Sequence, residues 1–262
     1  MDTTQRFSTR AEDYARYRWD YAEAAIEAVC DIVQLKSEAC VADIGAGTGI
    51  LTRHFVARAR YVYAVEPNAA MRRWAIQALA GYPAFIAVDS RAEAIPLPDR
   101  AVELITVGQA LHWFLAPAAK SEFVRILKPD GWLAVFRNSS TDPSYDRLMK
   151  DLRSERFGWD TSEANKSPGQ PVSVYFESDD YLKLSFPAAA RLNWESFFGA
   201  LCSHSHAPEE SHELFPEFQI KAREIFVRLS KDGLMTVPYA TEVSLGQMAL
   251  MHRTSPTSTL HG

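Results

Sequence analysis

Three closely spaced glycines mark the part of the chain whose residue types could do chemistry. The stretch "VADIGAGTGILT" (41–52) begins with apolar residues, passes through Gly45, Gly47 and Gly49, and then becomes apolar again. Glycine lacks a Cβ and accepts positive φ, so such a turn lets backbone amides approach a ligand closely. A carboxylate, Asp43, stands two residues before the first glycine. The stretch therefore predicts a strand, a ligand-binding turn and a helix.

Turns of this kind bind two different cofactors, the dinucleotides and S-adenosylmethionine. The dinucleotide pattern, GxGxxG or GxGxxA, would place Ile50 at its last position, where a branched side chain works against close helix–strand packing. Glu66 ends the next apolar stretch, and its carboxylate can accept hydrogen bonds from a ribose diol. Both cofactors carry that diol, so Glu66 alone does not separate them. The glycines by themselves also fit a tight turn that binds no ligand.

The residues around the turn resemble those of a known family. Asp43 and the glycines resemble motif I of the class I methyltransferases, "hhDxGxGxG", residue for residue. Later motifs of that family are similar to "VYAVEPNAAMRRWA" (62–75), "FIAVDSRAEAIPLPDRAVELITVGQALHWF" (85–114) and "LKPDGWLAVF" (127–136). The opening "FSTRAEDYARYRWDYAEA" (7–24) and the late pieces "LNWESFFGALCSHSHAP" (192–208) and "YATEVSLG" (239–246) resemble the type 11 group related to trans-aconitate methyltransferase. These motifs are specific for a fold and a cofactor, and much less specific for a substrate.

The resemblance implies S-adenosyl-L-methionine as the cofactor and S-adenosyl-L-homocysteine as its product. By family position, Asp43 holds the cofactor ammonium through water and Glu66 takes the ribose hydroxyls. Arg91 stands where many relatives have Asp and cannot accept from the adenine amino group, so that contact falls to the backbone or to Asp89. The full set assigned to the cofactor is Tyr17, Arg18, Asp43, Gly45, Ala46, Gly47, Glu66, Pro67, Met71, Asp89, Arg91, Ala92 and Gln109.

The acceptor side of the site is less well marked. His112 is the candidate catalytic residue, because an imidazole with a pKa near 6.5 can act as a general base toward a hydroxyl. The alternative is that His112 only orients its loop or the substrate. The residues predicted to bind the acceptor are Tyr14, His112, Trp113, Trp194, Phe198 and His204. Around the histidines of "CSHSHAPEESH" (202–212), no nearby carboxylate or cysteine completes a convincing metal site, so no metal is expected.

Five apolar stretches must position these residues. Strands are predicted at 41–44, 61–66, 84–89, 102–107 and 132–137, with helical segments between them. Such alternation predicts an α/β fold, a Rossmann-like, doubly wound, mostly parallel seven-stranded sheet with a helical cap inserted before the last strands. Ligands of such a sheet bind at the carboxyl ends of its strands.

The chain divides into three predicted regions. Residues 1–138 would form the S-adenosylmethionine-binding core with an N-terminal lid helix. Residues 139–248 would form the cap, or substrate region, and the final strands of the sheet. Residues 249–262 would be a flexible tail.

Composition limits the function classes. The net charge of -5 and the pI near 5.8 give no general attraction to nucleic acid or anionic lipid. Three cysteines without CxxC spacing suit a reducing compartment, and no stretch reads as a signal peptide or a membrane span. We therefore expect a cytoplasmic protein whose partner is a small molecule, and the oligomeric state stays open.

These observations predict an S-adenosylmethionine-dependent methyltransferase that acts on a small molecule. Oxygen of a carboxyl or hydroxyl group is the first candidate acceptor, and nitrogen or carbon of a small metabolite or natural product is the alternative. Two hypotheses from other functional classes remain, an NAD(P)-binding oxidoreductase and a non-catalytic cofactor-binding protein.

Overall fold

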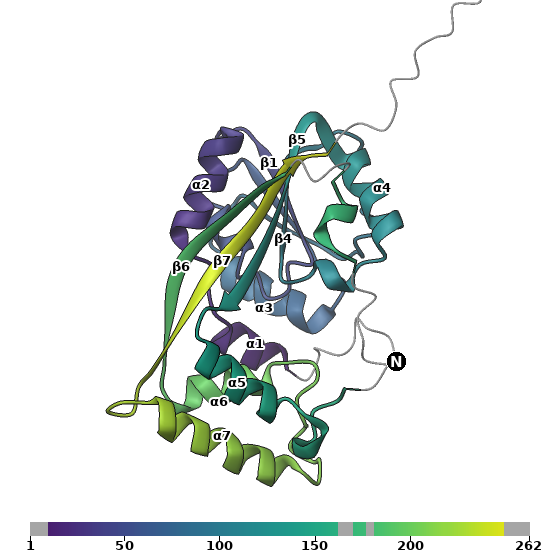
Figure 1. Ribbon diagram of the computed structural model, residues 1–262. Coiled ribbons are helices and arrows are strands. Elements are labelled where there is room, and N and C mark those ends of the chain that lie inside the picture. The colour runs from purple at the N-terminus through teal and green to yellow at the C-terminus, as the bar shows by residue number, and fades with distance from the viewer. Residues whose placement is uncertain (1–9, 162–169, 177–180, 249–262) are drawn as a thin grey trace, which may run out of the picture.

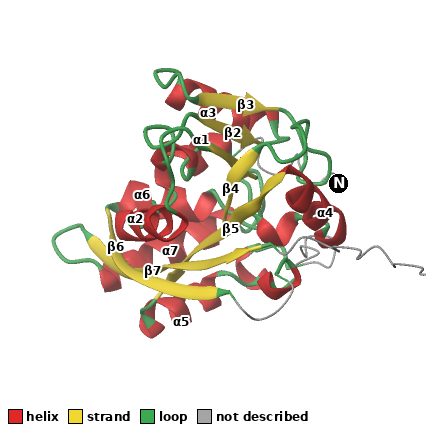
Figure 2. Ribbon diagram, turned by 90° about the horizontal axis from the view of Figure 1, so that it is seen from above, coloured by secondary structure: helices red, strands yellow, loops and turns green. Residues whose placement is uncertain are grey.

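The computed structural model describes residues 10–161, 170–176 and 181–248. One seven-stranded sheet runs through the molecule in the order β3-β2-β1-β4-β5-β7-β6. The first five strands are parallel, and the last two are antiparallel to their neighbours. This confirms the predicted seven-stranded, mostly parallel, Rossmann-like sheet, whose twist is visible in Figure 2. The predicted tail, 249–262, lies outside the described residues.

The strands follow the apolar stretches of the sequence closely. Four of the five residues of β1 are buried, as expected for a strand that is covered on both faces. The bounds are β1 Cys40–Ile44, β2 Tyr61–Val65, β3 Phe85–Val88, β4 Val102–Gly108, β5 Leu127–Ser140, β6 Leu182–Leu192 and β7 Met235–Gln247.

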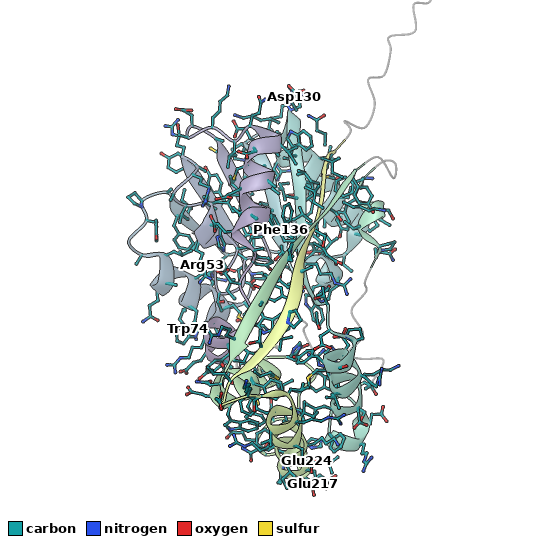
Figure 3. The ribbon with its side chains drawn as sticks, turned by 60° about the vertical axis from the view of Figure 1, so that its left-hand side comes forward. Arg53, Trp74, Asp130, Phe136, Glu217 and Glu224 are labelled. Carbon is teal, nitrogen blue, oxygen red and sulfur yellow. The ribbon has the colours of Figure 1, made fainter. Side chains whose placement is uncertain are left out.

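Helices cover both faces of the sheet (Figure 1). On one face, α2 (Glu23–Val33) packs Ile26 and Val29 in a cluster with Phe136 of β5. Figure 3 labels Phe136 within the sheet. On the other face, α4 (Ala116–Ile126) buries Phe123 in a second cluster. Helix α3 (Ala69–Leu79) joins the first cluster through its last residue.

The segment after the glycine turn differs from the predicted α-helix. It forms a short 3-10 helix, Thr52–His54, followed by further turns. The hydroxyl of Thr52 donates to Asp43 Oδ2 at 2.6 Å, which ties this segment to β1. Side-chain bonds of this kind from threonine compete with regular helix formation.

The cap lies beyond the carboxyl ends of the parallel strands and has its own apolar cluster. Its helices are α5 (Pro143–Leu152), α6 (Trp194–Cys202) and α7 (Phe215–Leu229), and α1 (Ala11–Tyr17) lies beside them (Figure 1). Strands β6 and β7 extend into the cap, where Met235 and Val237 join its cluster. The cap is therefore joined to the sheet by a continuous antiparallel pair.

Candidate active site

A large cavity opens at the carboxyl ends of β1, β2 and β4. We call it the cofactor cavity; its volume is about 650 Å³. It lies on both sides of the break in strand order between β1 and β4, where ligands of open α/β sheets bind. Predicted cofactor residues on its wall are Arg18, Gly45, Gly47, Glu66, Pro67, Met71, Arg91, Ala92 and Gln109, and predicted acceptor residues are Tyr14, His112, Trp113 and His204.

The glycine turn admits no larger residue at its first position. Gly45 has φ +70°, and a Cβ there would lie 2.6 Å from the Cβ of Ala110 and 3.2 Å from Phe114. The amides of Gly45 and Ala46 donate to the carbonyl of Val65, which anchors the turn to β2. The cavity wall here is bare backbone because the local packing and the positive φ both require glycine.

Glu66 is held in place by the turn that it faces. Its Oε2 accepts from the amide of Gly47 at 2.9 Å, and its Oε1 accepts from the amide of Asn68 at 2.8 Å. Burial raises the pKa of this carboxyl, and the two amides oppose that shift. A carboxylate has about four acceptor positions, so two remain for a ligand. Asn68 also caps α3 through Oδ1, which accepts from Ala70 and Met71.

Asp43 lies behind the turn instead of on the wall of the cofactor cavity. It is fully buried and accepts from Thr52 at 2.6 Å and from Thr106 at 2.9 Å. Burial raises its pKa to about 6, and the two hydroxyls oppose the shift. It lines a separate cavity of about 30 Å³ beside Ala46, which has room for one water. The predicted water-mediated role is compatible with this place. The two threonines were missed by the sequence reasoning, although each is a hydroxyl in a buried apolar stretch.

Asp89 does not line the cofactor cavity. Its carboxylate is exposed and pairs with Arg72 at 2.6 Å, and Arg72 in turn donates to the carbonyl of Glu66. The placement of Asp89 at the adenine is therefore corrected. Ser90 and Glu93 lie on the wall beside Arg91 instead.

Tyr17 also lies off the cavity wall. Its hydroxyl donates to Glu195 of α6 at 2.7 Å, and its ring packs directly over Gly199. This corrects its assignment to the cofactor, because the contact with α6 turns the side chain toward the cap. Arg18 does reach the cavity, and its guanidinium lies 4.8 Å from the ring of Tyr14.

Gln109 takes an uncommon backbone conformation at the end of β4. Its φ is +55°, which few residues with a side chain adopt. Its amide donates to the carbonyl of Phe136 at 3.0 Å, and its Nε2 donates to the carbonyl of Asn138 at 3.2 Å. Such local strain is frequent at ligand sites.

His112 faces the cofactor cavity from a 3-10 turn, Leu111–Trp113, directly after β4. Desolvation by the surrounding protein lowers its pKa to about 4, and the positive charges of Arg137 and Arg18 act in the same direction. Its surface remains accessible through the cavity. The ring is therefore neutral at neutral pH, but it is a weak proton acceptor.

Two predicted acceptor residues are partly buried and pack against the apolar cluster of the cap. The rings of Trp194 and Phe198 stack with centroids 5.0 Å apart and pack against α7 through Phe226 and Phe218. Neither residue lines the cofactor cavity or the smaller cavity that adjoins it toward the cap. Their placement at the acceptor is therefore corrected. Both lie one helical turn apart on α6, on the face that α7 covers.

The residues present fit S-adenosylmethionine. The cavity has the size of a typical cofactor site. It combines a glycine turn, a buried carboxylate with free acceptor positions, and an apolar side formed by Pro67, Met71 and Ala92. The described residues contain no cluster of three side chains that could hold a metal ion. In the same part of the chain, no helix has the length and apolarity needed to cross a bilayer.

Residues 42–135 match the family model described as "Methyltransferase domain". An uncharacterized methyltransferase of Mycobacterium bovis is 33% identical over 173 residues, which are 65% of this chain and 63% of that protein. The chain thus spans less than two thirds of that relative. One from Geobacillus kaustophilus is 30% identical over 162 residues, covering 58% of this chain and 74% of that protein.

Solved structures share the fold at low identity. The YcgJ protein of Bacillus subtilis aligns with a TM-score of 0.53 at 18% identity, covering 86% of this chain and 97% of that one. The cyclase SpnF aligns with a TM-score of 0.51 at 13% identity, covering 94% and 95%.

Proposed function

Because the chain belongs to the class I S-adenosylmethionine-dependent methyltransferase family, we propose that it transfers a methyl group to a small-molecule acceptor. The family's cofactor is S-adenosyl-L-methionine, and S-adenosyl-L-homocysteine is the product formed from it. The observation that carries the proposal is the buried carboxylate of Glu66 beside the glycine turn, at the wall of a cavity of cofactor size. We assign cofactor binding to the region up to residue 138 and acceptor binding mainly to residues 139–248.

The chain's own residues would bind and orient the reactants. Glu66 would accept from the ribose hydroxyls with its two remaining acceptor positions, and Gly45 and Gly47 would leave room for the amino-acid end. Met71 and Ala92 would form the apolar side for the adenine. When bound, the cofactor supplies an electrophilic methyl group that a lone pair of the acceptor attacks in line with the departing sulfur. The protein's contribution is alignment of the reactants in a site with little water.

The state of His112 favours an acceptor that needs no strong base. A neutral imidazole with a pKa of about 4 accepts a proton poorly from a hydroxyl, whereas a carboxylate is already deprotonated at neutral pH. We therefore rank carboxyl oxygen above hydroxyl oxygen, and nitrogen or carbon acceptors next. His112 would orient the acceptor or its own loop.

The three cysteines are unpaired, which supports a reducing compartment such as the cytoplasm. An NAD(P)-dependent oxidoreductase and a non-catalytic binding protein are the competing functions. The likeness to a cyclase of the same fold shows that the fold alone does not decide the reaction.

Calorimetry tests the proposal. We expect the protein to bind S-adenosylhomocysteine and not NADH, and Glu66→Ala to weaken the first affinity by about 10- to 100-fold, because each lost bond to a charged group costs about 1.5–3 kcal/mol. Glu224→Gln is the control, since Glu224 is exposed on α7 at the outer side of the cap (Figure 3). Tight binding of NADH without binding of S-adenosylhomocysteine would contradict the proposal. Cofactor binding with no methylation of any acceptor in a broad panel would favour the non-catalytic function.

A further inference from the structure

A second cavity, of about 360 Å³, adjoins the cofactor cavity between the end of β5 and helices α5 and α6. We call it the cap cavity. The two cavities share the lining residues Arg18, Gln109, Arg137, Asn138 and His204. A molecule in the cap cavity would therefore lie next to whatever occupies the cofactor cavity.

Three arginines from distant parts of the chain line the cap cavity. Arg18 follows α1, Arg137 lies on β5 and Arg153 follows α5. None of the three forms an ion pair with a carboxylate of the described residues. Asp146, exposed on α5, is the one acidic side chain among the lining residues. The wall of the cavity thus carries an excess of positive charge.

The protein itself satisfies these guanidinium groups poorly. Arg18 donates to the carbonyl of Ser203 at 3.4 Å, and Arg153 contacts Nε2 of His204 at 3.5 Å. The Nε atoms of both arginines are buried without a hydrogen-bond partner. The side chain of Arg137 is exposed and makes no hydrogen bond or ion pair within the described part of the chain. The buried Nε donors of Arg18 and Arg153 cost free energy unless a ligand satisfies them.

The charges also act on one another. Burial lowers the pKa of Arg18, and the positive charge of Arg153 lowers it further. Burial, Arg18 and Arg153 together hold the pKa of His204 well below its usual value, so this ring is neutral. Negative charge would relieve the repulsion between these arginines, and an anion in the cavity would supply it.

We propose that the cap cavity binds a carboxylate of the methyl acceptor, so that the substrate is a small organic acid. The proposal rests on the methyltransferase function proposed above and adds the class of the acceptor. Planar guanidinium groups match a carboxylate through paired N–H donors. The remaining wall suits a carbon skeleton, since it includes Trp19, Leu192, Phe197 and Leu201.

Among the described residues, the helix start that borders the cap cavity is already capped by a side chain. The first turn of α5 borders the cavity, but Asp142 already accepts from the amides of Ser144 and Tyr145. The arginine side chains are therefore the charged groups that would hold the anion. This arrangement favours an organic carboxylate over a phosphate held at a helix N-terminus.

Binding to the full-length protein saturated with S-adenosylhomocysteine tests this inference. The probes are succinate, citrate and benzoate, the neutral amides succinamide and benzamide, and inorganic phosphate. We expect at least one carboxylate to bind at least tenfold more tightly than its amide. Arg153→Gln should weaken that binding at least tenfold and leave the affinity for S-adenosylhomocysteine unchanged, and Arg153→Lys should retain part of it.

Two further variants guard against a folding artefact. Arg137→Gln removes a guanidinium with no described partner and should weaken carboxylate binding in a folded protein. Arg147→Gln is the matched control, because Arg147 is exposed on α5 and does not line the cavity. The inference is overturned if no carboxylate binds better than its amide, if only phosphate binds, or if Arg147→Gln weakens binding as much as Arg153→Gln. Failure of the wild-type protein to bind S-adenosylhomocysteine would instead reject the proposed function.

Discussion

Two carboxylates flank the glycine turn, and their surroundings give them different tasks. Glu66 meets backbone amides and keeps acceptor positions directed to the cofactor cavity. Asp43 meets two hydroxyls and is sealed behind the turn. One side chain is placed to bind a ligand, and the other fixes the strand, the turn and the neighbouring strand relative to one another.

The titration of Asp43 gives a prediction about stability. Its pKa is about 6 in the folded protein and about 3.8 in an unfolded chain, so the folded state binds more protons between these values. This residue's contribution to stability therefore rises as the pH falls through that window. We expect the free energy of unfolding of the wild type minus that of Asp43→Asn to rise by about 2 kcal/mol from pH 7 to pH 4.5. Denaturant unfolding of both proteins at the two pH values measures this difference in the free energy of unfolding. A difference that does not change with pH would contradict the prediction.

The titration of His112 gives a second prediction. With a pKa of about 4, the ring should stay neutral in the folded protein down to about pH 5, whereas in a short peptide spanning residues 109–115 it should titrate near the ordinary value of 6.5. Proton NMR of the imidazole resonances follows the titration in the folded protein and in the peptide. The spectrum of His112→Gln identifies which signal belongs to His112. A folded-state midpoint near 6.5 would restore His112 as a candidate general base at neutral pH.

At the scale of elements, the turn after β1 depends on backbone conformation and on crowding together. Gly45 has both a positive φ and a neighbour in the way of a Cβ, Gly233 has only the positive φ, and Gly81 has neither. These three positions separate the two causes within one chain.

We expect alanine at these positions to destabilise the protein in that order. Gly45→Ala should cost about 2–4 kcal/mol, Gly233→Ala about 1–2 kcal/mol, and Gly81→Ala less than about 1 kcal/mol. Denaturant unfolding measures the costs, and calorimetry should show weakened S-adenosylhomocysteine binding for Gly45→Ala alone. Equal costs at all three positions would mean that neither strain nor crowding at Gly45 matters.

At the scale of the whole molecule, the site is assembled from both ends of the chain. Arg10, just before α1, donates to the carbonyls of Cys202, His204 and Ala207, which lie at and after the end of α6. Together with the packing of Tyr17 on Gly199, these bonds fix the N-terminal helix to the cap. Arg18, which borders both proposed binding cavities, depends on that docking for its position.

Gly199→Ala should loosen this docking, because the added methyl would overlap the ring of Tyr17. We expect faster hydrogen exchange in the α1 peptide 11–17 and weaker ligand binding. Tyr17→Phe is the control, since it removes only the hydrogen bond to Glu195 and should cost less than about 1 kcal/mol. Exchange in α1 that is no faster in Gly199→Ala than in Tyr17→Phe would show that the ring contact does not hold the helix.

The sequence by itself determined the parallel sheet and most of the cofactor wall. Gly45, Gly47, Glu66 and Gln109 each follow or end a parallel strand, and the carboxyl ends of such strands meet at one edge of the sheet. Their place in the chain therefore fixes their place in space, apart from local details such as the 3-10 turn held by Thr52.

Only the tertiary structure decided the acceptor side. Trp194 and Phe198 face α7, Tyr17 faces α6, and Asp89 pairs with Arg72, because the face that a side chain occupies depends on what packs against its element. The arginines of the cap cavity are separated by more than a hundred residues between Arg18 and Arg137, and no spacing rule joins them. Their convergence follows from the docking of the N-terminal helix and the cap onto the end of β5, which is a property of long-range packing rather than of any local pattern.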